Sequence, residues 1–315
     1  MNAVLKNIFI NPIGLQVRAG WRMAMFLLVM VAGNIAVTGP VVAFLQSNGW
    51  MNNGAAMFSF YAVATGTTWI MLRFVDKRPF VAVGIPFNRS MVRELGQGLL
   101  FGGLMMSGIF AIESAAGIVH LEYRVLSFGE QAGIFANAAF LYIVVGYGEE
   151  FLFRGYLFQS FVEGTNKWIA TIAVSLLFAI AHAKNPNAST FGLINVGLAG
   201  VWLAIGYFKT RALWLSIGMH ISWNFAQGFV YGYPVSGTTS DKEQIVHAVV
   251  NGPVWLTGGT FGPEGGALAT GMLVIGSALI MFWPWVRPAA TAWSLERWRE
   301  EKQSVIIETE TPAAV

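Results

Sequence analysis

The chain is built from long apolar stretches separated by short polar segments. A helix needs about 20 apolar residues to cross the hydrocarbon core of a bilayer, so stretches near this length are candidate membrane-spanning helices. There are eight such stretches, at approximately residues 23–45, 55–75, 95–117, 131–162, 168–183, 190–208, 212–233 and 264–286. The fourth is long for one span, and we expect it to tilt, to extend beyond the bilayer or to break near Gly146 and Gly148. The pattern predicts an all-α, polytopic membrane helical bundle.

The distribution of basic residues supports the count of eight spans. With a cytoplasmic amino terminus and alternating spans, 15 of the 19 Lys and Arg residues fall in cytoplasmic segments. Three fall on the outer side, namely Arg124, Lys184 and Lys242, and the remaining residue, Arg154, lies within a span. Because Lys and Arg concentrate in the cytoplasmic loops of membrane proteins, we expect both termini to be cytoplasmic.

Composition agrees with a lipid environment and narrows the chemistry. Of the 315 residues, 55% are hydrophobic and 11% are charged, whereas a soluble domain carries about 25% charged residues. The net charge of +3 is modest and spread along the chain, so it does not indicate nucleic-acid binding. No cysteine is present, which excludes thiolate metal sites, disulfides and cysteine nucleophiles. The first apolar stretch is about twice the length of a signal-peptide core, and we interpret it as a retained span.

We predict one membrane domain over residues 1–290, with its chemistry in a core at about 131–233, followed by a cytoplasmic tail over 291–315. The tail is expected to form a short interfacial helix and then to be disordered. The connector over residues 78–94 is expected to lie along the membrane surface, and the Gly- and Pro-rich segment 234–263 is expected to cap an outward opening. The absence of an internal repeat gives no support to a transporter with duplicated halves.

Charged residues inside the fourth stretch are the first candidates for function, because ionisable residues within spans are rare and usually functional. Glu150 and Arg154 stand four positions apart on a helix, share a face and are expected to pair. Glu149 lies about 100° round the helix and is expected to remain free to act as a general base or acid. Glu113, by contrast, is expected to be an interfacial carboxylate, and two histidines, His120 and His247, fall in predicted outer loops.

Two further spans carry polar residues at a similar depth. Glu149 is 14 positions before Glu163 and His182 is 15 positions after Lys167, so both lie about 21 to 23 Å from the cytoplasmic turn. Two residues of the seventh span, His220 and Asn224, share a face. Counted from Arg211 at the cytoplasmic end of that span, they lie at about 14 and 20 Å by the same rise per residue. We therefore expect one shared site with two carboxylates, two imidazoles and an amide.

This residue set suits hydrolysis by either of two routes. A glutamate and a histidine can deprotonate water while other groups stabilise the oxyanion. Alternatively, two histidines and a carboxylate can hold a catalytic zinc ion. The helical zinc motif H-E-x-x-H and the nucleophile elbow G-x-S-x-G are both absent.

The ordered motifs EEFLFR, FAIAH and HISWN resemble the three signatures of the CPBP intramembrane proteases, over about residues 131–233. That family includes the CAAX prenyl endopeptidases and bacteriocin-processing and self-immunity (Abi) proteins. The resemblance implies that Glu149 activates water with His182, that Glu150 and Arg154 organise the site, and that His220 and Asn224 stabilise the oxyanion. The family has been described both as metalloproteases and as metal-independent glutamate proteases.

We favour the metal-independent route, and expect no cofactor, because Asn224 is a poor zinc ligand and Arg154 lowers the net negative charge of the site. The alternative is zinc held by Glu149, His182 and His220. The expected activity is endopeptidase cleavage of a membrane-associated or lipidated peptide or protein, in a multi-pass protein of the bacterial inner membrane. Two other functions stay open at this point: a non-catalytic immunity or scaffold protein that binds a partner in the same pocket, and a transporter with a Glu/His proton relay.

Overall fold

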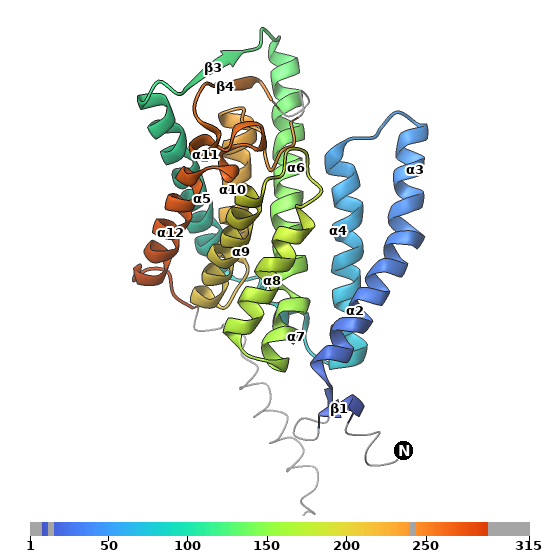
Figure 1. Cartoon of the computed structure of the whole chain (residues 1–315). Coiled ribbons are helices and arrows are strands. Elements are labelled where there is room, and N and C mark those ends of the chain that lie inside the picture. Colours follow the sequence, from blue (N-terminus) through green and yellow to red (C-terminus); the bar gives the residue numbers. More distant parts are fainter. Residues whose placement is uncertain (1–7, 12–15, 240–243, 289–315) are drawn as a thin grey trace, which may run out of the picture.

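The computed structural model describes residues 8–11, 16–239 and 244–288, which form a bundle of long helices (Figure 1). The predicted tail at 291–315 lies outside these residues. The helices are α2 (Ala19–Gly33), α3 (Gly39–Ser47), α4 (Asn53–Ile70), α5 (Arg89–Ala115), α6 (Phe128–Arg154), α7 (Tyr156–Gly164), α8 (Lys167–Ala181), α9 (Thr190–Thr210), α10 (Trp214–Phe225), α11 (Val254–Thr257) and α12 (Ala267–Phe282). Short strands pair as β1 (Ile10–Asn11) with β2 (Gln16–Val17), and as β3 (Val119–Tyr123) with β4 (Val246–Val250).

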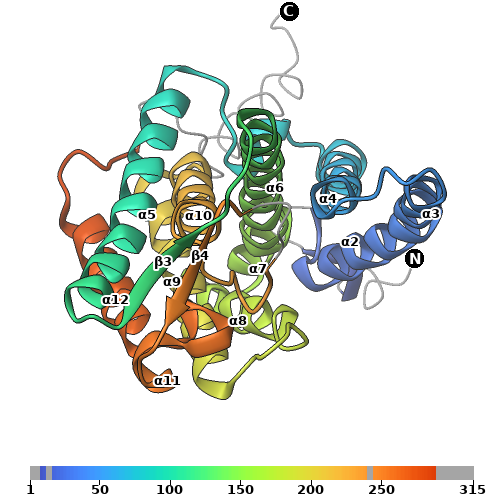
Figure 2. The ribbon, with the colours of Figure 1, turned by 90° about the horizontal axis from the view of Figure 1, so that it is seen from above.

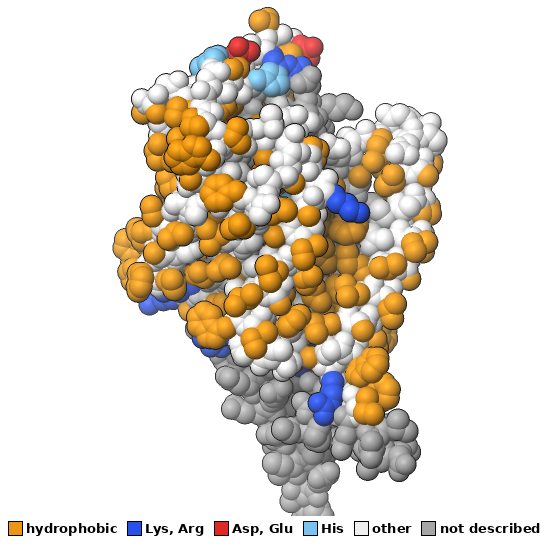
Figure 3. Space-filling model, viewed as in Figure 1, with side chains coloured by type: hydrophobic (Ala, Val, Ile, Leu, Met, Phe, Trp, Pro, Cys, Tyr) orange, Lys and Arg blue, Asp and Glu red, His pale blue; other side chains and the backbone are white. Residues whose placement is uncertain are grey.

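Each of the eight predicted stretches is largely helical, so the prediction of a helical membrane bundle is confirmed. Among the described residues, five helical segments are long and apolar enough to cross a membrane, at Ala19–Ser47, Asn53–Asp76, Arg89–Ala115, Phe128–Gly164 and Thr190–Thr210. The helices α8 and α12 are apolar but shorter. Hydrophobic side chains cover the middle of the visible face, and most charged ones lie toward its two ends (Figure 3). Strand β1 and the last turn of α12 lie at the same end of the bundle, opposite β3 and β4 (Figure 1).

The fourth stretch breaks at Gly155, so the expected break near Gly146 and Gly148 is wrong. A Cβ at position 155 would lie 2.2 Å from the Phe151 carbonyl oxygen, so only glycine fits this link between α6 and α7. Gly146 and Gly148 lie within the regular helix α6. They serve close packing instead, since a Cβ at Gly146 would meet Ile221 of α10 at 2.5 Å.

Helix α10, which carries two of the predicted site residues, packs between α5, α6 and α9 (Figure 2). Its contact with α5 is close because glycines lie on both sides. A Cβ at Gly98 would come within 2.2 Å of the Leu215 carbonyl oxygen, and one at Gly102 within 2.1 Å of that of Met219. Glycines four residues apart allow two membrane helices to approach backbone to backbone. This interface therefore fixes α10 firmly against α5.

Part of the connector over residues 78–94 packs into the bundle. Ala82, Val83 and Ile85 are buried in a hydrophobic cluster with residues of α2, α4 and α10. Its carbonyls also bind the start of α10, since the Trp214 indole donates to the Pro86 carbonyl at 2.8 Å. The apolar residues of this connector therefore pack against the helices and close one end of the bundle.

The segment after α10 folds back over the other end of the bundle. Antiparallel β3 and β4 place His120 and His247 on strands rather than in loops, and the side chain of His120 is exposed. The expectation of an interfacial Glu113 is wrong, because its carboxylate is fully buried and accepts a 2.6 Å hydrogen bond from the Tyr233 hydroxyl. Glu113 thus anchors the segment after α10 to α5.

Four charged side chains form an ion-pair cluster at the end of the bundle near β1. Arg22 of α2 contacts Asp76 at 3.2 Å and Glu163 of α7 at 2.9 Å. Arg78 also pairs with Glu163. We refer to Arg22, Asp76, Arg78 and Glu163 as the terminal ion-pair cluster. It ties together α2, the segment that follows α4 and the end of α7.

Candidate active site

A cavity of about 630 Å³ lies within the bundle, in the size range of small-ligand pockets. Its walls are mostly apolar. Residues from α4, α6, α8, α9 and α10 line it, together with part of the segment that follows α10, including Ser236, Thr238 and Glu264. The expectation that the segment 234–263 caps an opening agrees with this lining. Four of the predicted site residues reach the cavity, namely Glu149, His182, His220 and Asn224.

The predicted pair of Glu150 and Arg154 is present and fully buried behind the cavity. Arg154 Nη1 donates to Glu150 Oε1 at 3.0 Å, and Arg154 Nη2 donates to the Gly200 carbonyl of α9 at 3.1 Å. The guanidinium lies over the Phe178 ring at 4.5 Å from its centre, a cation–π arrangement. Both the charge and the hydrogen-bonding capacity of Arg154 are therefore engaged inside the protein, as burial of a charge requires.

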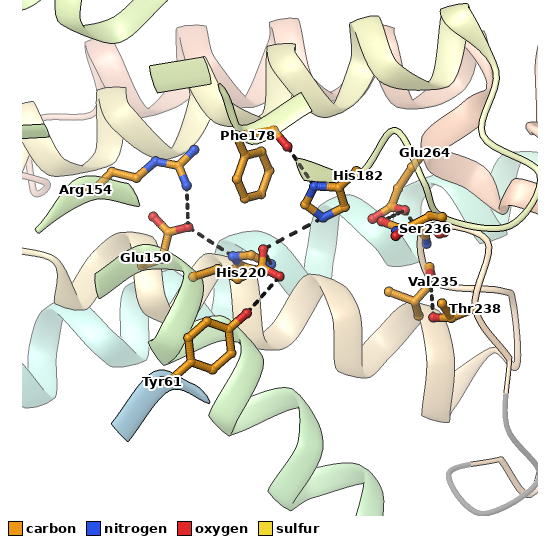
Figure 4. A network of polar contacts seen from close by, with 12 residues as sticks. Tyr61, Glu150, Arg154, Phe178, His182, His220, Val235, Ser236, Thr238 and Glu264 are labelled. Atoms are coloured by element: carbon orange, nitrogen blue, oxygen red, sulfur yellow. Dashed lines mark hydrogen bonds and ion pairs between the residues drawn. The ribbon is translucent and has the colours of Figure 1, made fainter. Parts of the chain in front are cut away.

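The two histidines are held through their Nδ1 atoms. Glu150 Oε1 lies 3.0 Å from His220 Nδ1, and the Phe178 carbonyl oxygen lies 2.8 Å from His182 Nδ1 (Figure 4). Because both partners are acceptors, each Nδ1 is assigned the proton, and each neutral imidazole then presents the lone pair of Nε2. His182 follows directly after the last residue of α8, where the helix ends. The phenylalanine of FAIAH thus orients the histidine through its main chain.

Glu149 faces these two Nε2 atoms. Its Oε2 lies 3.9 Å from His182 Nε2 and 3.8 Å from His220 Nε2, distances beyond direct hydrogen bonding. Among the described residues, Glu149 Oε2 is buried and has no hydrogen-bond partner. Its other oxygen, Oε1, accepts from the Tyr61 hydroxyl at 3.3 Å. The structure thus assigns the two adjacent glutamates different surroundings, as the helical spacing predicted.

Asn224 lies one turn after His220 on α10, is 5% exposed and lines the cavity. Within the residues that the structure describes, its amide makes no hydrogen bond, so both amide groups remain available to a bound group. All six predicted residues therefore come together, four at the cavity and two behind it. One polar neighbour was missed: Tyr61 of α4 carries no charge, belongs to no motif and is separated from Glu149 by 88 positions.

In the part of the chain that the structure describes, no three His, Asp or Glu side chains are grouped as ligands of a metal ion. The alternative of zinc held by Glu149, His182 and His220 stays a prediction.

The fold and the site define a polytopic helical membrane protein with paired glutamates and two histidines at an internal cavity. Residues 131–226 match the family model described as Type II CAAX prenyl endopeptidase Rce1-like. The match includes all three motifs and confirms the predicted resemblance to CAAX-type intramembrane proteases. It supports a protease at the level of the family.

A relative is also found among known proteins. The uncharacterized protein YyaK of Bacillus subtilis (strain 168) is 28% identical over 245 residues, which are 69% of this chain and 80% of the relative. No solved structure matches. The similarity to YyaK extends well beyond the segment that matches the family model, so most of the bundle is shared with it.

Proposed function

We propose that this protein is a glutamate-type intramembrane endopeptidase that hydrolyses a peptide bond of a membrane-associated or lipidated substrate. The observation that carries the proposal is the unpartnered Glu149 Oε2 facing two imidazole Nε2 atoms at a cavity. Two of these atoms, Glu149 Oε2 and His182 Nε2, are acceptors without a donor between them, and a water molecule with its two O–H donors would suit both. The resemblance to a protease family supports the same reaction class.

Glu149 is proposed as the general base. A water hydrogen-bonded to Glu149 Oε2 and to His182 Nε2 is oriented by both groups, and its oxygen attacks the carbonyl carbon of the substrate as Glu149 takes the proton. The C–O bond forms, and the carbonyl oxygen becomes an oxyanion. Transfer of that proton to the leaving nitrogen then allows the C–N bond to break, which yields a carboxylic acid and an amine, and the acid passes its remaining proton to the amine to give a carboxylate and an ammonium group. Glu149 returns to its ionised form.

Asn224 and His220 are proposed to stabilise the oxyanion. The Asn224 amide has a free N–H group at the cavity, whereas His220 has its Nδ1 directed at Glu150 and can donate from Nε2 only as an imidazolium. Glu150 would balance that charge, and Arg154 holds Glu150 in place. Glu150 and Arg154 thus act through His220 and do not line the cavity. A preorganised donor of this kind contributes about 10²-fold to 10³-fold in kcat.

The proposed setting is a bacterial plasma membrane, with both termini cytoplasmic and the lipid bilayer as the partner of the apolar helix faces. The reaction as proposed needs no cofactor. Elemental analysis of the purified protein tests this point: less than one zinc per ten chains is expected, and stoichiometric zinc that is lost in His220→Ala would overturn the metal-independent mechanism.

Substitution of Glu149 tests the proposed activity. Host cells without the native chain would express wild-type, Glu149→Gln or Glu122→Gln protein at equal membrane abundance, and new peptide N-termini in the membranes would be quantified. Glu122 is the matched control because its side chain, on strand β3, is exposed and does not line the cavity. We expect a set of N-termini that appears with wild type and with Glu122→Gln and falls by at least about 100-fold with Glu149→Gln.

Identical sets of N-termini for wild type and Glu149→Gln would contradict the protease. A cellular phenotype that survives Glu149→Gln undiminished would instead favour the non-catalytic immunity or scaffold protein.

A further inference from the structure

Tyr61 brings a helix from outside the family-like segment to the centre of the site. It belongs to α4, whereas the match to the family model begins at residue 131. Seen in Figures 1 and 2, α4 stands with α2 and α3 to one side of the bundle. Its Tyr61 is 7% exposed, lines the cavity and donates from its hydroxyl to Glu149 Oε1 at 3.3 Å.

The ring of Tyr61 is seated against a residue without a side chain. A Cβ at Gly148 would lie 2.1 Å from Tyr61 Cγ and 2.2 Å from its Cδ2, so no other residue at 148 leaves room for the ring. Gly148 directly precedes Glu149 in α6. Gly148, which gives the Tyr61 ring its place, therefore directly precedes Glu149, which accepts the hydrogen bond from the Tyr61 hydroxyl.

The phenol determines how the Glu149 carboxylate is presented. A carboxylate has two oxygens, and a donor on Oε1 fixes the rotation of the group and leaves Oε2 directed at His182 and His220. Without that donor the carboxylate is free to rotate about its terminal torsion, which has broad preferences. We propose that Tyr61 is a positioning residue that holds Glu149 in the orientation required to deprotonate water. This inference rests on the proposed endopeptidase activity.

Tyr61→Phe is the decisive variant, because it keeps the ring against Gly148 and removes only the hydroxyl. Tyr147→Phe is the matched control: Tyr147 lies on α6, stacks on Phe151 with ring centres 5.5 Å apart and does not line the cavity. Each variant and Glu149→Gln would be expressed as the full chain. The readouts are the cleaved N-termini, the kcat and KM for a fluorogenic peptide spanning one of those sites, and the thermal unfolding temperature in detergent.

We expect Tyr61→Phe to lower kcat by about tenfold, the scale of one hydrogen bond to a charged group. Its KM should stay within about twofold of wild type, since the interaction serves the base and not the substrate. Tyr147→Phe should leave both constants within about twofold, and the two variants should unfold at similar temperatures.

Other outcomes separate the two proposals. If Glu149→Gln abolishes cleavage while Tyr61→Phe behaves as Tyr147→Phe, the role of Tyr61 is wrong and the endopeptidase stands. A raised KM at unchanged kcat would make Tyr61 a substrate-binding residue, and a lowered unfolding temperature that accounts for the lost activity would make it structural. Either result overturns the positioning role. No effect of Glu149→Gln overturns both proposals.

Discussion

Two groups of buried charges lie in this bundle, and they differ in how their carboxylates are matched. In the terminal ion-pair cluster two arginines face two carboxylates. Arg22 contacts both Asp76 and Glu163, and Arg78 contacts Glu163. The two positive and two negative charges are equal in number, and each carboxylate has a guanidinium beside it. Such a group is sufficient to join the ends of three helices.

The active-site group has two carboxylates for one arginine. Arg154 and His220 both contact Glu150, whereas Glu149 receives only the Tyr61 hydroxyl. The Glu149 carboxylate therefore keeps one oxygen without a partner among the described residues, at the wall of a cavity. A buried charge in a membrane helix is thus not in itself a sign of catalysis. Among the described residues, Glu113 is also held by a tyrosine hydroxyl alone, but it does not line the cavity. The distinguishing feature of Glu149 is a carboxylate without an arginine partner that faces two imidazoles at a cavity.

Substitution of Glu150, the arginine-paired carboxylate of the site, should have the largest effect on stability. Glu150→Gln leaves Arg154 without its ion pair at a position with no exposure to solvent. Breaking a buried pair in this way costs about 3–5 kcal/mol of unfolding free energy. Cleavage should also be lost, because His220 loses its partner. Unfolding in mixed detergent and SDS measures the change, and a value below about 1 kcal/mol would show that the pair does not stabilise the fold.

Glu163→Gln is the corresponding change in the terminal ion-pair cluster. It should destabilise by a somewhat smaller amount, about 3 kcal/mol, because Arg22 keeps Asp76 as a partner and the Glu163 side chain is 10% exposed. Cleavage per folded molecule should match wild type, since Glu163 does not line the cavity. The same unfolding titration, combined with the N-terminus assay, measures both quantities. Selective loss of cleavage at unchanged stability would contradict a structural role.

Gly148→Ala tests the contact between α4 and α6. The added methyl would overlap the Tyr61 ring, and overpacking of this kind costs about 1–3 kcal/mol. Displacement of Tyr61 should also reduce cleavage more than Tyr61→Phe does. Gly133→Ala on the same helix is the control, because a Cβ there meets nothing within 4 Å. Equal stability and activity for the two variants would show that the ring is not constrained by Gly148.

The sequence predicted the parts of the site that depend on local geometry. The pairing of Glu150 with Arg154 follows from a spacing of four residues, and the meeting of Glu149 with His182 agrees with their equal estimated distance from the cytoplasmic turn. His220 meets them although its own estimate was shorter. The sequence did not predict Tyr61, because a single uncharged aromatic in an apolar helix resembles any other core residue.

Contacts between distant segments account for the other differences. The Arg22–Glu163 pair joins residues 141 positions apart, and no pattern along the chain indicates that pairing. The break in the fourth stretch was misplaced for a related reason. Gly155 ends a helix, whereas Gly148 makes room for a neighbouring side chain. The sequence alone does not distinguish these two roles of glycine. Only the packing of other helices distinguishes them.

The smallest effect on stability should accompany the loss of activity in Glu149→Gln. Glu149 has no arginine partner and a single 3.3 Å hydrogen bond from Tyr61, so the unfolding free energy should change by about 1 kcal/mol or less. The most direct test measures unfolding and the cleaved N-termini on the same preparation of this variant, beside Glu150→Gln. We predict that both variants lose cleavage and that only Glu150→Gln loses stability. A Glu149→Gln protein that still cleaves, or that unfolds as readily as Glu150→Gln, would contradict the assignment of Glu149 as the free base of the site.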